Sequence, residues 1–201
     1  MEQTLQKLLI TGFDPFGGQR INPSWETVQS LPDRIGNFSV SKLQIPTVYG
    51  LAAQTVLEKA NRLSPSAIIC VGQAAGRKAI TPELVGINLR YADIADNSGT
   101  IYKDSPIVTD GSNAYFSTLP VRAMADAISA KQIPAAVSYS AGAFVCNDVL
   151  YTLLHHYAGT DTKVCFIHVP LLPEQALHGE PSMPLDTIRN ALCAAIESLS
   201  L

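Results

Sequence analysis

Strand-like and helix-like segments alternate along the chain, and this alternation limits the possible folds more than any other feature. Short apolar runs that end in turn residues alternate with longer stretches whose apolar residues recur every three or four positions. This alternation favours an α/β fold, a single-domain α/β/α sandwich with a mixed, largely parallel central sheet. The apolar runs predict strands at residues 7–11, 38–45, 67–71, 83–89, 135–139 and 163–170.

Helices are expected between these strands. Asn22 is a typical N-cap, and Pro23 is a typical first residue for a helix that reaches about Leu31. Residues 90–118 are polar and rich in turn formers, which predicts a long irregular segment, and residues 170–184 form a proline-rich loop. Apolar residues at helical spacing predict four more helices, at residues 52–63, 121–130, 146–157 and 188–199.

Composition excludes several classes of protein. The 201 residues carry a net charge of −3, which argues against a nucleic-acid-binding role. No apolar run is long enough to span a bilayer, so we expect no membrane role. Residues 1–7 lack the basic and apolar segments of a signal peptide, which favours a cytoplasmic protein. No repeat or linker divides the chain, so we expect one domain over residues 1–201.

The four cysteines differ in their surroundings. None forms a C-x-x-C pair or has histidines at zinc-finger spacing, so we expect no metal and no cofactor. Cys70 and Cys165 lie in strand-like runs, and Cys193 lies in the last predicted helix, where each is expected to pack as a small apolar residue. Cys146 alone stands at a junction between a turn and a helix.

Cys146 and His168 are the strongest candidates for chemistry. A cysteine at a helix N-terminus lies at the positive end of the helix dipole, which favours the thiolate. His168 lies at the end of the strand at residues 163–170, where it can accept the thiol proton. Functional sites in α/β folds form at the carboxyl ends of strands. Taken singly, however, a cysteine is more often inert and a strand-end histidine is more often structural.

Four blocks of sequence resemble the pyroglutamyl peptidase I family of cysteine peptidases, also called pyrrolidone carboxyl peptidases. They occur in the same order as in that family and are spread over most of the chain. The blocks are LITGFDPFGG with INPSWE (residues 9–18 and 21–26), VGQA running on to Glu83 (71–83), AGAFVCN (141–147) and FIHVPLLPEQ (166–175).

The resemblance implies an activity and a catalytic triad. Members of the family remove an N-terminal pyroglutamyl residue from peptides through a thioester acyl-enzyme. Matched motif by motif, Cys146 is the expected nucleophile, His168 its base, and Glu83 the acid that orients the imidazole. Without the resemblance, Glu83 would be interpreted as a solvated surface carboxylate. The family is often tetrameric, so the resemblance also implies a homo-oligomer.

The resemblance also implies a substrate pocket. Pyroglutamate is a flat, neutral lactam, which needs apolar walls and a few aimed hydrogen bonds. Phe13 and Phe16 match the family's stacking residues, although each is also compatible with an ordinary core aromatic. Gln73 offers both a donor and an acceptor to the lactam. Asn22 either fixes the first loop or simply caps the helix after it.

One departure from the family leaves alternative functions open. The family commonly reads DARIPDN where this chain reads YADIADN (residues 91–97), so that Asp93 replaces an arginine near the active site. Arg90 is a candidate to compensate for that loss. The exchange favours, as an alternative, a pyroglutamyl-binding homologue with weakened catalysis. A nucleoside phosphorylase-like enzyme is a further alternative, based on architecture alone and without a phosphate-binding arginine cluster.

Overall fold

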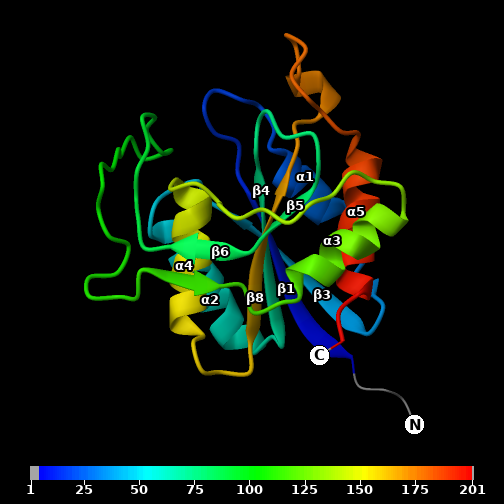
Figure 1. The fold of residues 1–201 in the computed structure, drawn as a ribbon, viewed down its shortest axis with the longest axis horizontal. Helices are drawn as coiled ribbons and strands as arrows, with labels where there is room; N and C mark the ends of the chain where they lie inside the picture. The colour runs from blue at the N-terminus through cyan, green and yellow to red at the C-terminus, as the bar shows by residue number, and fades with distance from the viewer. Residues whose placement is uncertain (1–4, 201) are drawn as a thin grey trace.

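A six-stranded sheet forms the centre of the computed structural model, which describes residues 5–200 (Figure 1). The strand order is β2-β3-β1-β4-β8-β5, with the four inner strands parallel and the two outer strands antiparallel to their neighbours. The expected mixed, largely parallel sheet is therefore confirmed. The strands are β1 (Gln6–Phe13), β2 (Arg34–Ile35), β3 (Phe38–Ile45), β4 (Ala67–Gln73), β5 (Thr81–Glu83) and β8 (Lys163–Val169).

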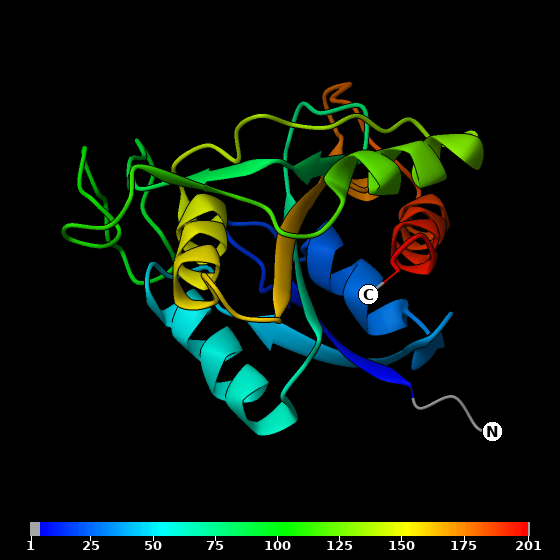
Figure 2. The ribbon, with the colours of Figure 1, turned by 60° about the horizontal axis from the view of Figure 1, so that its bottom comes forward.

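Helices cover both faces of this sheet, which gives the three layers visible in Figures 1 and 2. Successive residues of the inner strands point to opposite faces, so Leu8 and Ile10 enter one apolar core while Leu9 enters the other. Helices α2 and α4 pack on the Leu9 side, and α1, α3 and α5 pack on the other side. Their bounds are α1 (Pro23–Ser30), α2 (Leu51–Leu63), α3 (Val121–Ala130), α4 (Val145–His156) and α5 (Leu185–Glu197).

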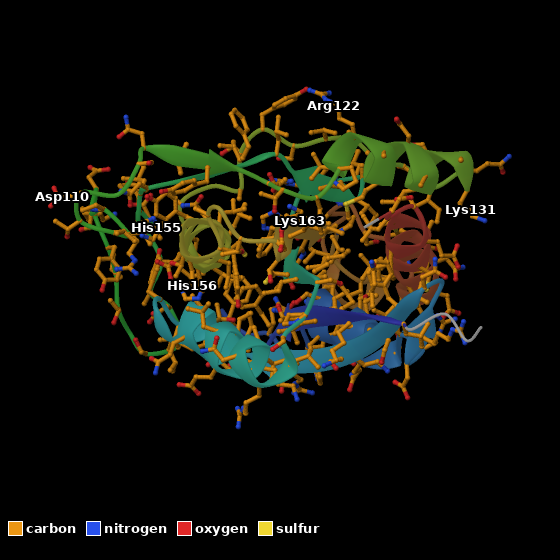
Figure 3. All side chains as sticks on the ribbon, turned by 90° about the horizontal axis from the view of Figure 1, so that it is seen from below. Asp110, Arg122, Lys131, His155, His156 and Lys163 are labelled. Carbon is orange, nitrogen blue, oxygen red and sulfur yellow. The ribbon has the colours of Figure 1, made fainter. Side chains whose placement is uncertain are left out.

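Local signals located most of these elements well. The side chain of Asn22 accepts a hydrogen bond from the Ser24 N–H at 3.1 Å, and Pro23 is the first residue of α1 as expected. Helix α4 begins at Val145, one residue before the candidate nucleophile. The predicted irregular segment at residues 90–118 is confirmed over residues 90–113, but residues 114–116 form a short strand; the outer part of the segment, with Asp110, extends beyond the α4 side of the molecule (Figure 3).

Two predicted strands were wrong. Residues 83–89 do not form one strand, because the chain passes at Leu84 from β5 in the main sheet to β6 (Val85–Ile87), which pairs with β7 (Ala114–Phe116) in a second sheet. An apolar run has the same pattern in either sheet, so periodicity cannot reveal this change of partner.

Residues 135–139 run beside residues 80–83 and pair with them through two isolated bridges, Ala135 with Ile80 and Ser138 with Glu83. Four backbone hydrogen bonds join the two segments, but Pro82 in β5 lacks an N–H group and so interrupts the ladder. The segment before the Cys146 helix is therefore an extended loop, not the expected strand.

The expectation that residues 1–7 carry no signal peptide rests largely on residues 1–4, which lie outside the described residues. Among the helices of residues 5–200, none combines the length and the apolar character that crossing a bilayer requires.

The end of β1 and the start of α1 approach so closely that only glycine fits between them. A Cβ atom at Gly12 would lie 2.6 Å from the backbone N and Cα atoms of Trp25.

We expect Gly12→Ala to lower the free energy of unfolding by about 3 kcal/mol, because the clash is with backbone and side-chain rotation cannot relieve it. Urea unfolding measures this. The exposed strand substitution Ser39→Ala is the control, with an expected change below about 0.5 kcal/mol; equal stability of both variants would contradict the close approach.

Candidate active site

A cavity of about 340 Å³ opens where β1, β4 and β8 end. Parallel strands place their carboxyl ends together, so residues distant in sequence meet there. Of the seven expected site residues, all but Glu83 line this cavity, and Glu83 lies behind His168. The lining is formed by Phe13, Phe16, Asn22, Thr47, Gln73, Ala74, Arg77, Ser140, Ala141, Gly142, Phe144, Cys146 and His168.

Strand register brings the candidate catalytic side chains to one face of the sheet. His168 is the register partner of Gly72 in β4, and Glu83 in β5 is the partner of Phe166, two residues before His168. Alternate strand residues share a face, so the side chains of Glu83 and His168 lie on the side covered by α4. A side chain at Gly72 would point to the same side.

Gly72 leaves room for the sulfur of Cys146. A Cβ atom at Gly72 would lie 3.0 Å from Cys146 Sγ and 2.6 Å from the ring of Phe166. The thiol at the start of α4 therefore sits against the bare backbone of β4, next to the strand position of His168. This contact explains how a helix residue reaches the sheet so closely.

Glu83 and His168 form a buried pair. His168 Nδ1 lies 2.7 Å from Glu83 Oε1, and the two residues are 4% and 0% exposed. When Nδ1 donates to the carboxylate, Nε2 is left as the basic nitrogen of the imidazole. The carboxylate, which local sequence would place at the surface, is thus completely buried.

Arg77 is a member of this cluster that sequence reasoning missed. Its Nη1 lies 2.6 Å from the same Glu83 Oε1 that His168 contacts, and it also bonds the Thr81 hydroxyl. Its Nη2 donates to the carbonyl of Ser140 at 3.1 Å, in the loop that leads into α4. No local pattern distinguishes this arginine in its turn after β4, because its significance comes from partners that are distant in sequence.

Burial controls the charge state of the candidate nucleophile. It raises the pKa of the Cys146 thiol to about 12, and the Glu83 carboxylate adds to the rise while Arg77 opposes it. Burial also lowers the pKa of His168, against the opposite effect of Glu83. Burial therefore favours the neutral thiol and the neutral imidazole. For Cys146, this direction is opposite to the one expected from the helix dipole alone.

Aromatic rings form the apolar walls of the cavity. Phe13 is buried, and its ring centroid lies 6.2 Å from that of Phe166. It also lines the cavity, so it is both a core aromatic and a wall of the cavity. Phe16 faces Phe144 at 6.0 Å between centroids. Phe144 is the N-cap residue of α4, and its contribution was not foreseen from the sequence.

Two polar side chains complete the lining. The two interpretations of Asn22 are both correct: its Oδ1 caps α1, and its Nδ2 donates to the carbonyl of Asp14 at 2.9 Å and so fixes the first loop. Gln73 ends β4 and accepts a hydrogen bond from Gln175 at 3.1 Å. A cavity with aromatic walls and a few directed amides can hold a flat neutral ring beside a thiol.

The comparison with known proteins agrees with this geometry. The pyroglutamyl peptidase family model matches residues 6–200. The chain belongs to the pyroglutamyl peptidase family. A pyrrolidone-carboxylate peptidase of Bacillus cereus strain AH820 is 46% identical over 198 residues, which cover 96% of this chain and 92% of the relative. One from Staphylococcus saprophyticus is 48% identical over 197 residues, with the same coverage of 96% and 92%.

Solved structures show the same fold. The crystal structure of pyroglutamyl peptidase I from Bacillus amyloliquefaciens has a TM-score of 0.93 at 43% identity, covering 96% of each chain. Pyrrolidone carboxyl peptidase from Thermococcus litoralis has a TM-score of 0.92 at 35% identity, covering 96% of this chain and 93% of that one.

The departure from the family pattern at Asp93 lies outside the cavity lining. The Asp93 side chain is 78% exposed and forms an ion pair with Lys103. Arg90 does not compensate within the cavity, because it binds Asp148 at 2.5 Å and lies over the ring of Tyr102. The Asp93 carboxylate is therefore not among the groups that line the cavity or shift the pKa of Cys146.

Removing the Arg77 charge tests these electrostatics. Arg77 lowers the pKa of Cys146, so Arg77→Met raises it and leaves less thiolate at any given pH. We expect alkylation of Cys146 by iodoacetamide at pH 8 to slow about tenfold. Mass spectrometry of the peptide that carries Cys146 separates it from the other thiols. Arg122→Met, on the exposed face of α3, is the matched control, and equal rates in both variants would contradict the role of the guanidinium.

Proposed function

We propose that this chain is a cysteine omega-peptidase that hydrolyses the pyroglutamyl residue from the N-terminus of peptides. The main support is that Cys146, His168 and Glu83 converge on one aromatic-walled cavity in a member of the pyroglutamyl peptidase family. Relatives of 46% and 48% identity are named for this activity. In this proposal Cys146 is the nucleophile, His168 the general base and acid, and Glu83 the group that orients His168.

The proposed reaction has two stages. His168 Nε2 takes the proton of the Cys146 thiol as the sulfur attacks the pyroglutamyl carbonyl, and the imidazolium then protonates the leaving amine. The C–N bond breaks and a thioester remains on Cys146. His168 next takes a proton from water, which attacks the thioester and releases pyroglutamate and the free thiol. Because burial disfavours charge on both groups, we assign the proton transfer to the same step as the attack.

Two features stabilise charge in this reaction. Glu83 holds Nδ1 of His168 at 2.7 Å and offsets the positive charge that the imidazole acquires. The first turn of α4 has backbone N–H groups without partners inside the helix, and we assign to them the oxyanion that forms on the attacked carbonyl.

The proposed substrate fits the polarity of the cavity. A pyroglutamyl ring has no free α-amine, so its binding requires no carboxylate partner. Phe13, Phe16 and Phe144 offer apolar walls to its flat ring, while Gln73 and Asn22 offer amide groups to its edge.

We further propose a cytoplasmic homo-oligomer, with a tetramer as the assembly. All four cysteines are free thiols, as expected in a reducing compartment. Exposed large apolar side chains, including Ile94, Ile101 and Phe116, offer surface for contacts between subunits. No described feature favours the nucleoside phosphorylase-like alternative.

Hydrolysis of a fluorogenic pyroglutamyl amide tests the proposed activity. We expect wild-type turnover and a loss of at least about 10³-fold in kcat/KM for Cys146→Ala, because the nucleophile is absent. Cys193→Ala, on α5 and far from the cavity, is the control and should retain activity. No turnover by the wild type, or full turnover by Cys146→Ala, would refute the proposal.

The substitution Asp93→Arg distinguishes an active enzyme from a homologue with weakened catalysis. Because its side chain is 78% exposed and its ion pair with Lys103 lies at the surface, we expect Asp93→Arg to change kcat/KM by less than about threefold. The same fluorogenic assay measures this. A large gain in kcat/KM for Asp93→Arg would instead support the weakened-homologue alternative.

A further inference from the structure

Gln175 is a buried side chain that links three segments around the cavity. It ends the short 3-10 helix η1 (Pro173–Gln175) and is 9% exposed. Its Oε1 accepts a hydrogen bond from the Leu172 N–H at 3.1 Å. Its Nε2 donates to Gln73 Oε1 at 3.1 Å and to the Ile21 carbonyl at 3.4 Å. The proposed reaction assigns no role to this residue.

The chemistry of the backbone partners determines the orientation of both amides. The Leu172 N–H can only donate and the Ile21 carbonyl can only accept, so the oxygen of Gln175 must face Leu172 and its nitrogen must face Ile21. The same Nε2 group then faces Gln73, which can meet it only with its own oxygen. The assignment of oxygen and nitrogen in Gln73 therefore follows from two backbone groups.

This orientation decides what Gln73 can offer to a ligand. Gln73 lines the cavity, and its oxygen is turned towards Gln175, which donates to one of its two lone pairs. The group that remains for the cavity is the amide NH₂, which is a donor only. A ligand atom that bonds this NH₂ group must therefore be an acceptor.

We propose that Gln175 is a positioning residue for specificity, which holds the Gln73 amide so that its NH₂ donates to the ring carbonyl of the pyroglutamyl group. This inference rests on the proposed function and names one contact within it. The ring carbonyl distinguishes pyroglutamyl from a saturated five-membered ring of the same size. If the Gln73 amide were reversed, its oxygen would face the carbonyl oxygen, and a buried acceptor would lack a donor.

The substitution Gln175→Glu tests this proposal with almost no change in shape. The new carboxylate still accepts from the Leu172 N–H, but it cannot donate to Gln73 or to Ile21. Gln73 is then expected to turn its NH₂ towards the carboxylate and its oxygen towards the cavity. Glu174→Gln is the matched control, because it makes the reverse chemical change at the adjacent, exposed position.

Binding is measured in a Cys146→Ala background, so the test does not depend on turnover. NMR titration compares the amide of pyroglutamic acid with cyclopentanecarboxamide, which has a ring of the same size without the carbonyl or the N–H. We expect Gln175→Glu to weaken the pyroglutamyl ligand about ten- to a hundredfold and the cyclopentane ligand less than about threefold. Glu174→Gln should change neither affinity.

The two ligands separate positioning from a general structural role. Equal weakening of both ligands by Gln175→Glu, or no weakening of the pyroglutamyl ligand, would overturn the proposal. If Gln175→Glu does not fold by circular dichroism, Gln175→Met carries the same comparison, with an expected selective loss of about fivefold because Gln73 is then free to turn. Failure of the wild type to hydrolyse pyroglutamyl amides would refute the proposed function, while the binding comparison would still test Gln175.

Discussion

The candidate site depends on one buried carboxylate oxygen. Glu83 Oε1 is the hydrogen-bond partner of both His168 Nδ1, at 2.7 Å, and Arg77 Nη1, at 2.6 Å. Glu83 Oε2 is buried without a hydrogen-bond partner among the described residues. A buried charge is strongly destabilising unless partners offset the loss of water. Two donors on one oxygen link the imidazole, the turn after β4 and the loop before α4 into a single unit. Disturbing any one of these segments therefore affects the other two.

Close backbone contacts let the fold bring this unit together. The edge strand β5 is antiparallel to β8, and their register turns Glu83 to the same face as His168. Gly72 leaves space there for the sulfur of Cys146, just as Gly12 lets the start of α1 approach the end of β1. In both places a missing side chain allows a helix N-terminus to lie against the carboxyl end of a strand. The site thus uses the position where α/β folds commonly bind ligands.

The sequence predicts the locally determined parts of the molecule and misses those that depend on distant partners. Helix α3 and the Asn22 cap follow from periodicity and capping, which act over a few residues. The split of residues 83–89 and the missing strand at 135–139 depend on which sheet accepts each segment. The burial of Glu83 and the contacts of Arg77 and Gln175 have the same origin. The family resemblance identified Glu83, but nothing local distinguished the other two.

Burial has two effects at the candidate site. Burial favours the neutral forms of Cys146 and His168, and a low local dielectric also strengthens directed hydrogen bonds. A neutral lactam loses little hydration energy on entering such a site, whereas a charged α-amine would lose much more. The oriented amide of Gln73 then discriminates by the cost of an unmade hydrogen bond, which is larger in a dry site. Low polarity and a few fixed donors therefore act together: the first excludes charged N-termini, and the second selects among neutral rings.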